Sequence, residues 1–449
     1  MNKVQKLALI YLLSILLLGY GYAVGRLQVF PHQLLESLIQ DYQIFAEGDP
    51  LEKDSSAVAK LRNDWGFSFG RWNYDYPKNA SDGSIPLPYS KFRDKREPPL
   101  IFLDQEHRTG YRVIVGAFDM LQSFWGALLI DPEGQIIHSW NLTTEHIPGK
   151  FKSDRMKNLY GVHVFPDGSV IYNMTERSGG IVKVDACSNI VWNLLGSFHH
   201  AVSPDEDGSF WTFIGKSATY DQDLVRASQK TGEILSQIKM ADVRAANPNL
   251  HIWNLGLLGN QEIGHMTHAN DVDPLPQHLV ADFPGLEAGD LAISYASTNL
   301  VFILNPQTLL VKWWRVGVSD FHHDPDWEPG GMISLFSNNQ RSDKGSSDIV
   351  TIDYLSMKDE LSVDGGPLKF YSNANGRHQL TPYGTRLVTS SKQGWAFETD
   401  ENGKVIFSFV NNVDSKERQA LHLSEAWRFD EDYFETDFWN FCTQETTGK

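Results

Sequence analysis

Five segments of this chain contain histidines beside groups that could support nucleophilic and acid–base chemistry. A neutral imidazole is a good nucleophile near neutral pH, and a hydrogen bond to its second nitrogen fixes the tautomer. Asp324 follows His323 in FHHDP, and Asn270 follows His268 in THAND, so carboxylate and amide groups are close enough in sequence to orient the rings. His322 is the less favoured of its pair because adjacent strand residues face opposite sides. The histidines concerned are His163, His199, His200, His268, His322, His323 and His378.

Short β-hairpins that repeat along the chain would position these histidines. Each hairpin pairs an alternating apolar run with an Asp, Asn or Gly turn and a second run, which is typical of the outer half of a propeller blade. The repeats predict an all-β fold, a six-bladed β-propeller, whose innermost strands line a central channel where the histidines would meet. The predicted hairpins are Gly126–Trp140, Gly179–Leu194, Asp223–Ile238, Asn299–Trp314, Asp348–Val363 and Gly394–Val410.

The composition fits one large folded body. About six blades of roughly 45 residues would use most of the chain after residue 100. The 13 Trp and 25 Phe residues supply the aromatic packing that stacked sheets need. The formal net charge of −17 argues against binding to a phosphate backbone. We therefore expect no nucleic-acid partner.

Residues 1–26 are predicted to be an N-terminal membrane-anchor helix. Lys3 and Lys6 precede the apolar run Leu7–Val24, which is about long enough to cross a bilayer core. A cleaved secretory signal is the alternative, although the cleavage site before Arg26 is poor. Because the basic flank is amino-terminal, the bulk of the chain is expected outside the cytoplasm, in the periplasm or another extracytoplasmic space.

Three regions are predicted after the anchor. Residues 27–104 form a helical and loop linker, residues 105–412 the propeller, and residues 413–449 an acidic, aromatic C-terminal segment. Within the linker, Pro31–Gly48 has the apolar stripe of a helix. The stretch Leu421–Phe441 either clasps the propeller or remains a partner-binding tail, and the sequence does not identify protein partners.

The cysteines and the glycine spacing argue against several classes of site. Cys187 and Cys442 could form one bridge in an oxidising compartment, but the sequence leaves open whether they pair. Neither has metal-type spacing or the Cys-x-Pro-x-Arg of a formylglycine sulfatase. The run Gly215-Lys216-Ser217 lacks the upstream glycine that a phosphate loop needs. We expect no metal and no cofactor.

In their order along the chain, the segments between roughly residues 105 and 430 resemble the bacterial arylsulfotransferase family. The resemblance is carried by YGVHVFPDGSVIYN, FHHAVSPDEDG, THANDVDPLP with GDLAISYASTNLVFILNP, FHHDPDWEPGGMISLFSNN, and HQLTPYGTRLVTSS with AFETDENGKVIF. Members of that family are exported six-bladed propellers that move a sulfuryl group between phenols without a nucleotide donor. The resemblance implies that an aryl sulfate and a phenol are the small-molecule partners of this chain.

The same resemblance implies roles for individual residues. The histidine of a QHDP-like segment becomes sulfated in that family, and this histidine corresponds to His323. His200 or His199, together with His268, would assist at the sulfuryl oxygens or the phenol. Contacts with the substrate are expected from Asn270, Asn299, Arg341 and Trp327.

The chain departs from the family pattern at Ala296 and at Ser337, which stands where the family tends to have an Asp, and the departure at Ala296 matters most. Family members have an arginine in an S-x-R-N-like segment that holds the sulfuryl oxygens, whereas this chain has Ala296 there, which cannot supply charge. Arg341 or Arg377 could supply the cation instead. The second hypothesis is therefore a propeller that has lost the reaction and acts as a binding or assembly module. Trp327 could stack on an aryl donor or only pack between blades.

Overall fold

The computed structural model describes most of the chain after residue 98. Two compact units, Met1–Asn63 and Asp64–Lys449, divide the chain, and only Tyr20 of the first is described. The predicted membrane helix and the predicted helix Pro31–Gly48 therefore lie outside the described residues, apart from Tyr20. Within the described part, no helix has the length and apolarity needed to cross a membrane. The described residues are 20, 70–71, 99–119, 124–143, 146–147, 158–175, 179–215, 222–253, 268–416 and 418–442.

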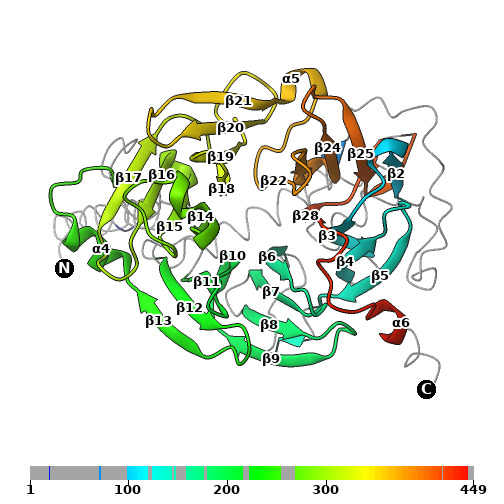
Figure 1. Ribbon diagram of the computed structural model, residues 1–449, viewed down its shortest axis with the longest axis horizontal. Helices are drawn as coiled ribbons and strands as arrows, with labels where there is room; N and C mark the ends of the chain where they lie inside the picture. Colours follow the sequence, from blue (N-terminus) through cyan, green and yellow to red (C-terminus); the bar gives the residue numbers. More distant parts are fainter. Residues whose placement is uncertain are drawn as a thin grey trace, which may run out of the picture. The chain divides into compact units, whose positions relative to one another are not determined.

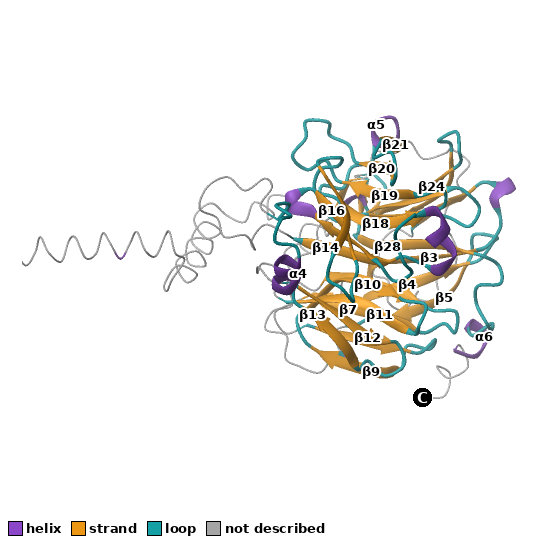
Figure 2. Ribbon diagram, turned by 60° about the vertical axis from the view of Figure 1, so that its left-hand side comes forward, coloured by secondary structure: helices purple, strands orange, loops and turns teal. Residues whose placement is uncertain are grey.

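Six antiparallel sheets of four or five strands lie around a common centre in the second unit (Figure 1). Each of the six hairpins expected from the sequence is present as two neighbouring strands in the outer part of one sheet. The fold is therefore a mainly β, six-bladed β-propeller, as predicted. Figure 2 shows the strands stacked in layers, with the short helices at the periphery.

Blades 1, 2 and 3 each contain four strands, named in order from the centre outward. Blade 1 consists of β28 (Leu423–Phe429), β3 (Tyr111–Asp119), β4 (Phe124–Ile130) and β5 (Ile136–Asn141). Blade 2 consists of β6 (Asn158–Val164), β7 (Val170–Thr175), β8 (Gly180–Val184) and β9 (Ile190–Leu195). Blade 3 consists of β10 (Phe198–Pro204), β11 (Ser209–Ile214), β12 (Asp223–Ser228) and β13 (Ile234–Ile238).

Blades 4 and 5 also have four strands, and blade 6 has five. Blade 4 consists of β14 (Ala269–Pro274), β15 (Leu291–Tyr295), β16 (Leu300–Leu304) and β17 (Val311–Val316). Blade 5 consists of β18 (His323–Glu328), β19 (Met332–Ser337), β20 (Asp348–Asp353) and β21 (Asp359–Asp364). Blade 6 consists of β22 (Arg377–Leu380), β23 (Arg386–Ser390), β24 (Trp395–Thr399), β25 (Val405–Val410) and β2 (Leu100–Leu103).

The remaining elements are short. A small sheet contains β1 (Gly70–Arg71), β27 (Gln419–Ala420) and β26 (Asn412–Asp414). The α-helices are α4 (Met240–Ala246), α5 (Gly365–Leu368) and α6 (Trp439–Cys442). The 3₁₀ turns are η1 (Gln105–His107), η4 (Gln277–Asp282), η5 (Ala296–Thr298) and η6 (Ser391–Gln393).

Aspartate side chains close several of the outer hairpins. The Oδ1 atoms of Asp131, Asp185 and Asp400 each accept a hydrogen bond from the backbone N–H four residues later, at 2.7, 2.8 and 2.9 Å. Such local bonds satisfy the turn backbone and explain why Asp recurs there. Gly134 and Gly403, three residues after their aspartates, have φ values of 84° and 76°, which glycine adopts without a steric penalty.

Strands from both ends of the propeller sequence close the ring. β28 pairs with β3 as the innermost strand of blade 1, and β2 pairs with β25 as the outermost strand of blade 6. The blades therefore extend from Leu100 to Phe429, beyond the predicted limits of residues 105 and 412. The blades were predicted from a hairpin pattern, and the single strands β2 and β28 do not show this pattern because neither belongs to an outer hairpin.

Three buried charges join blade 1 to blade 6. Arg112 of β3 donates from Nη2 to Oε2 of Glu398 on β24 at 2.9 Å, and Arg428 of β28 binds the other oxygen of the same carboxylate. The side chains of Arg112 and Glu398 have no exposed surface. Losing one partner of such a buried pair leaves an uncompensated charge, which typically destabilises a protein by about 3–5 kcal/mol.

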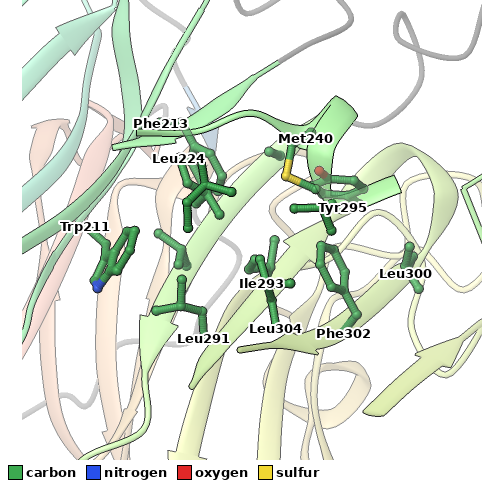
Figure 3. Close-up of a cluster of buried hydrophobic side chains, with 14 of the residues drawn as sticks. Trp211, Phe213, Leu224, Met240, Leu291, Ile293, Tyr295, Leu300, Phe302 and Leu304 are labelled. Atoms are coloured by element: carbon green, nitrogen blue, oxygen red, sulfur yellow. The ribbon is translucent and has the colours of Figure 1, made fainter. Parts of the chain in front are cut away.

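Apolar side chains between neighbouring blades form the core. Figure 3 shows the cluster between blades 3 and 4, in which Phe213 and Leu224 pack together with Ile293 and Phe302. All four are fully buried, and each buried side chain of this size contributes roughly 2 kcal/mol. Trp253 lies edge-to-face against Phe302 with ring centroids 5.3 Å apart, so it belongs to this core.

The C-terminal segment is fastened to the propeller. Cys442, at the end of α6, forms a disulfide with Cys187 at the turn between β8 and β9. The Phe438 ring contacts the rings of His138 and Trp140 on β5, at centroid distances of 5.1 and 5.6 Å. Of the two alternatives left by the sequence, this segment therefore clasps the blades.

We expect the double variant Cys187→Ser/Cys442→Ser to fold and to melt at a lower temperature than the parent. The disulfide joins positions 255 residues apart, and its loss restores freedom to the unfolded chain, which typically lowers stability by about 2–4 kcal/mol. Calorimetry measures the melting temperature. Dithiothreitol should destabilise the parent and leave the double variant unchanged, and a reduced parent that melts like the oxidised one would contradict this expectation.

Candidate active site

A cavity at the centre of the propeller is lined by residues from all six blades. The volume open to the centre of a water molecule is about 10 Å³, which corresponds to about one bound water. Most of its residues lie near the start of an innermost strand, where the strands converge in Figure 1. The lining residues are Leu159, Tyr160, His200, Asn270, His323, Asn375, Gly376, Arg377, His422 and Ser424.

Bulges in the innermost strands orient several of these side chains. A bulge adds an unpaired residue, bends the strand and redirects a side chain, and bulges are common beside active sites. The backbone there is unusual, because positive φ values are uncommon outside glycine and occur often at functional sites. The φ values are 60° at His200, 46° at His268 and 59° at Asp324. The register shifts lie between His199 and Ser203, Ala269 and Asp271, and His323 and Asp326.

Asn338 fixes the tautomer of His323. Nδ1 of His323 lies 2.6 Å from Oδ1 of Asn338. The Asn338 amide nitrogen donates to the carbonyl oxygens of Ser372 and Asn375, at 2.6 and 2.5 Å, so both of its protons are already used. Since the amide oxygen can only accept, Nδ1 of His323 carries the ring proton. Nε2 therefore holds the lone pair.

Burial keeps the histidines of the cavity neutral. It lowers the pKa of His323 to about 3, with a smaller contribution from His268 nearby. Burial also lowers the pKa of His200 well below its ordinary value and lowers that of His268. A histidine with a lowered pKa is deprotonated at pH 7. Without an anionic ligand in the cavity, these rings therefore present lone pairs and N–H groups rather than charges.

His200 lines the cavity, and His268, which is not among the lining residues, lies beside His200. Their ring planes are nearly perpendicular, with centroids 5.4 Å apart. Tyr160 stacks on His200 at 5.0 Å, and Nδ1 of His199 lies 2.6 Å from Nδ1 of His200. The predicted meeting of histidines from separate blades is thus present, with His199 behind His200 and outside the cavity lining.

Asn270 presents an amide oxygen that has no partner. Its Nδ2 donates to the carbonyl oxygen of His322 at 3.0 Å, whereas its buried Oδ1 has no hydrogen-bond partner among the described residues. The His322 ring does not line the cavity, and its Nδ1 lies 2.9 Å from Oγ of Ser294. Asn270 can therefore accept a hydrogen bond from a ligand.

Arg377 is the sole lysine or arginine among the described residues that line the cavity. Its Nη1 binds Asp271 and Asp324, the latter at 2.7 Å, and its Nε lies 3.8 Å from Oε2 of Glu425. The side chain is 12% exposed. Contacts with these acidic side chains therefore fix the position of the guanidinium in the cavity wall.

A family model described as arylsulfotransferase (ASST) matches residues 161–412, more than half of the chain. This chain belongs to the arylsulfotransferase family. No curated protein sequence matches it.

Several solved structures have a backbone similar to that of this arylsulfotransferase-family member, at low sequence identity. A Bacteroides caccae protein of unknown function has 10% identity and a TM-score of 0.46, over 71% of this chain and 98% of that one. Virginiamycin B lyase from Staphylococcus aureus has 11% identity and a TM-score of 0.34, over 56% and 69%. TolB from Acinetobacter baumannii has 11% identity and a TM-score of 0.39, over 71% and 66%.

Two residues predicted to contact the substrate, Asn299 and Arg341, do not line the cavity. Oδ1 of Asn299 accepts hydrogen bonds from the backbone N–H of Phe321 at 2.8 Å and from Nη2 of Arg341 at 2.6 Å. Arg341 is half exposed and also binds Asp320. Both residues therefore support the turn that leads into His323.

Trp327 is also absent from the cavity lining. It packs on Phe283 with ring centroids 4.8 Å apart, and its Nε1 donates to the carbonyl oxygen of Asp273 at 3.0 Å. Trp327 therefore fills the space between blades 4 and 5, the packing alternative that the sequence left open.

Ala296, which replaces the arginine of the arylsulfotransferase pattern, is fully buried. Its backbone N–H donates to the carbonyl oxygen of His268 at 3.1 Å. Of the two arginines considered as substitutes, Arg377 lines the cavity and Arg341 does not.

His422 and Ser424 line the cavity but were not predicted. His422 directly precedes β28, and its ring lies 5.9 Å from that of Trp125. The segment LHLSEAWRF has a histidine before an alternating strand, like the other five segments. No hairpin follows it, because the other strands of blade 1 come from the opposite end of the propeller sequence, and the signal was therefore missed.

Buried carboxylates and His378 form a network beside Arg377. Burial raises the pKa of Asp324 and of Asp326 well above the ordinary value, and neighbouring carboxylates raise both further. Asp324, Asp326 and His378 hold ligand atoms within 4.8 Å of one another, the single such group in the part of the chain that the structure describes. The His378 ring nitrogens already contact Asp324 at 2.9 Å and Ser334 at 2.7 Å. Hydrogen bonding therefore accounts for this arrangement.

We expect Glu425→Gln to stabilise the protein at neutral pH and to have little effect in acid. Burial raises the pKa of Glu425 from 4.5 to about 7. Between these values the folded protein binds more protons than the unfolded chain, so the free energy of unfolding falls as the pH rises. Glutamine does not ionise and avoids this loss. Urea unfolding of both proteins at about pH 5 and about pH 8 tests this, and an equal difference at both pH values would contradict it.

Proposed function

We propose that this protein is an extracytoplasmic aryl sulfotransferase that moves a sulfuryl group from an aryl sulfate to a phenol through a sulfated His323, without a nucleotide donor. Family membership supports the class of reaction. The observation that carries the assignment to His323 is the hydrogen bond from its Nδ1 to Asn338. This bond leaves a lone pair on Nε2 of a residue that lines the central cavity.

The first half-reaction uses His323 as a neutral nucleophile. Nε2 attacks the sulfur atom, the N–S bond forms as the bond from sulfur to the aryl oxygen breaks, and the phenolate leaves. Positive charge develops on the ring, and the oxygen of Asn338 stabilises it through the Nδ1 proton. By analogy with phosphoryl transfer, the transition state is loose and depends on donors placed around the oxygens.

The second half-reaction restores the enzyme. The acceptor phenol loses its proton and its oxygen attacks the sulfur, so that the N–S bond breaks and a new aryl sulfate leaves. Asn270 supports this step, since its unpartnered oxygen is suited to accept the hydroxyl hydrogen bond of a phenol. His200 and His268 are the candidate proton carriers.

We propose that Arg377 supplies the positive charge for the sulfuryl oxygens. It is the one cation among the described lining residues, and Ala296 offers none. Asp271 and Asp324 hold its Nη1, which fixes the direction of the guanidinium before a donor binds. Because this cation is already in position, it can stabilise the transition state without the reorientation that water molecules would need.

Side chains must move when a donor binds. The cavity holds about one water molecule, and a sulfuryl group is larger. Tyr160, which stacks on His200, is one side chain whose rotation would enlarge the space. Closure around the bound donor would then exclude water from the reactive N–S bond.

The proposed location is outside the cytoplasm, with residues 1–26 as membrane anchor. The basic and then apolar N-terminal sequence supports the anchor. The disulfide between Cys187 and Cys442 supports an oxidising compartment, because such bonds are rare in the cytosol.

Incubation with 4-nitrophenyl sulfate should add the mass of one SO₃ group to His323. His323→Asn should lack the adduct and release nitrophenol at least about 10³-fold more slowly, because a catalytic nucleophile is lost. Intact mass and peptide mapping locate the adduct. His138→Asn is the control, since His138 is a buried histidine on the outermost strand of blade 1. Nitrophenol release by His323→Asn at the parent rate would rule out this mechanism, and an inactive parent would favour the binding-module alternative.

Arg377→Met should slow nitrophenol release in a single turnover by about 10²–10³-fold, the usual effect of losing one oxyanion contact. Arg377→Lys keeps the charge and should fall between this variant and the parent. Arg315→Met is the matched control, because Arg315 binds Asp359 on the outer strands of blades 4 and 5. Near-ultraviolet circular dichroism checks folding, since methionine leaves Asp271 and Asp324 without their cation. A parent-like rate for Arg377→Met would assign the cationic role elsewhere.

A further inference from the structure

His199 lies behind His200 and makes its closest polar contact with it. The two Nδ1 atoms are 2.6 Å apart, so one ring donates a proton and the other accepts it. His199 has no exposed surface, and its Nε2 has no partner among the described residues. His200 lines the cavity, whereas His199 stacks on Phe213 at 5.8 Å. The pair therefore has one reactive end, the Nε2 of His200.

The shared hydrogen bond limits where the protons of the pair can be. Two neutral imidazoles carry two ring protons, and one of them lies between the Nδ1 atoms. If His200 donates that proton, its Nε2 has a lone pair and can act as a base, while His199 holds a proton on Nε2. When a proton is added to Nε2 of His200, both rings share the resulting positive charge through the Nδ1 contact.

We infer that His199 and His200 act as one proton-holding unit, in which His199 lets His200 keep the proton of the acceptor phenol until the next donor phenolate leaves. This role rests on the proposed sulfuryl transfer. His199 is a positioning residue in this scheme, since it touches His200 and not the substrate. Aryl sulfates of weakly acidic phenols are the donors that need such a proton most.

The proton count balances over the cycle. In the second half-reaction the acceptor phenol gives its proton to Nε2 of His200, the phenolate oxygen takes the sulfuryl group from His323, and the pair becomes a cation. In the next first half-reaction the pair returns this proton to the departing phenolate as the N–S bond to His323 forms. The pair is neutral again in the sulfated enzyme, and no other proton carrier is needed.

The surroundings of the pair explain why His200 needs a partner. Burial lowers the pKa of His200 most, and positive charge on His199, His268, His323 or Arg377 lowers it further. Burial lowers the pKa of His199 to about 3, with a further contribution from His268. A single buried imidazole in this position would be a weak base at pH 7. Sharing the charge between two rings, together with the anionic donor in the cavity, offsets these effects.

The dependence of the rate on the leaving phenol tests this inference. For His199→Asn and His199→Phe, single-turnover sulfation with phenyl sulfate should fall about 10²-fold, because general acid catalysis is lost. With 4-nitrophenyl sulfate, whose phenolate leaves without a proton, the rate should stay within about 3-fold of the parent. The pH profile for phenyl sulfate should also lose its acidic limb. His138→Asn is the control, and it should not slow sulfation by one donor more than sulfation by the other.

A merely structural role for His199 predicts a different result. Equal losses of rate for both donors, or no loss for either, would overturn the inference. An adduct on His323 after incubation of the same variants with 4-nitrophenyl sulfate would leave the sulfotransferase proposal standing.

One readout does not depend on activity. In the full chain labelled with ¹⁵N-histidine, a coupling across the hydrogen bond should connect two Nδ1 atoms and vanish in His199→Asn. A parent without this coupling would also overturn the inference.

Discussion

Closure of the ring between blades 1 and 6 is the constraint on which the central site depends. The lining residues lie on six innermost strands or directly before them, and these strands approach one another only when the sheets form a complete circle. Glu398 holds Arg112 and Arg428 at this seam, so the last strand of the propeller is fixed by charge as well as by backbone pairing. A shift of β28 would move His422 and Ser424 relative to His323, which lines the same cavity.

Burial determines the charge of the site. The same desolvation that lowers the histidine pKa values raises those of the carboxylates near Arg377, so the cavity combines neutral imidazoles with one guanidinium. A neutral His323 keeps the lone pair on Nε2 that attacks sulfur, whereas a protonated ring would have none. The carboxylates direct Arg377, and the raised pKa of Glu425 means that this carboxyl group neutralises only part of the positive charge near pH 7.

Much of the fold could be predicted because alternation and turn chemistry coincide in each outer hairpin. The aspartates that close the turns are visible in the sequence, and so are His200, His268 and His323 before their strands. Trp327 could not be assigned to one role from the sequence, since alternation along β18 turns it between the blades while Asp326 and Glu328 lie on the opposite face. The location of Arg341 depends on the path of an irregular loop, which residue types alone do not specify. Pairing of Cys187 with Cys442 depends on where α6 packs against the blades, which the sequence does not specify.

β28 is the innermost strand of blade 1, whose other three strands are made before those of blades 2 to 5, so the ring is completed only by the final part of the chain. Until then β3 presents an unpaired edge and the faces of the histidine-bearing strands are open to solvent, a state that favours association with other chains. If the protein is exported as proposed, this arrangement keeps the chain inactive during export, because no partial product can close around a working site. The order of synthesis would thus delay activity until the last strand of the propeller has been made and paired.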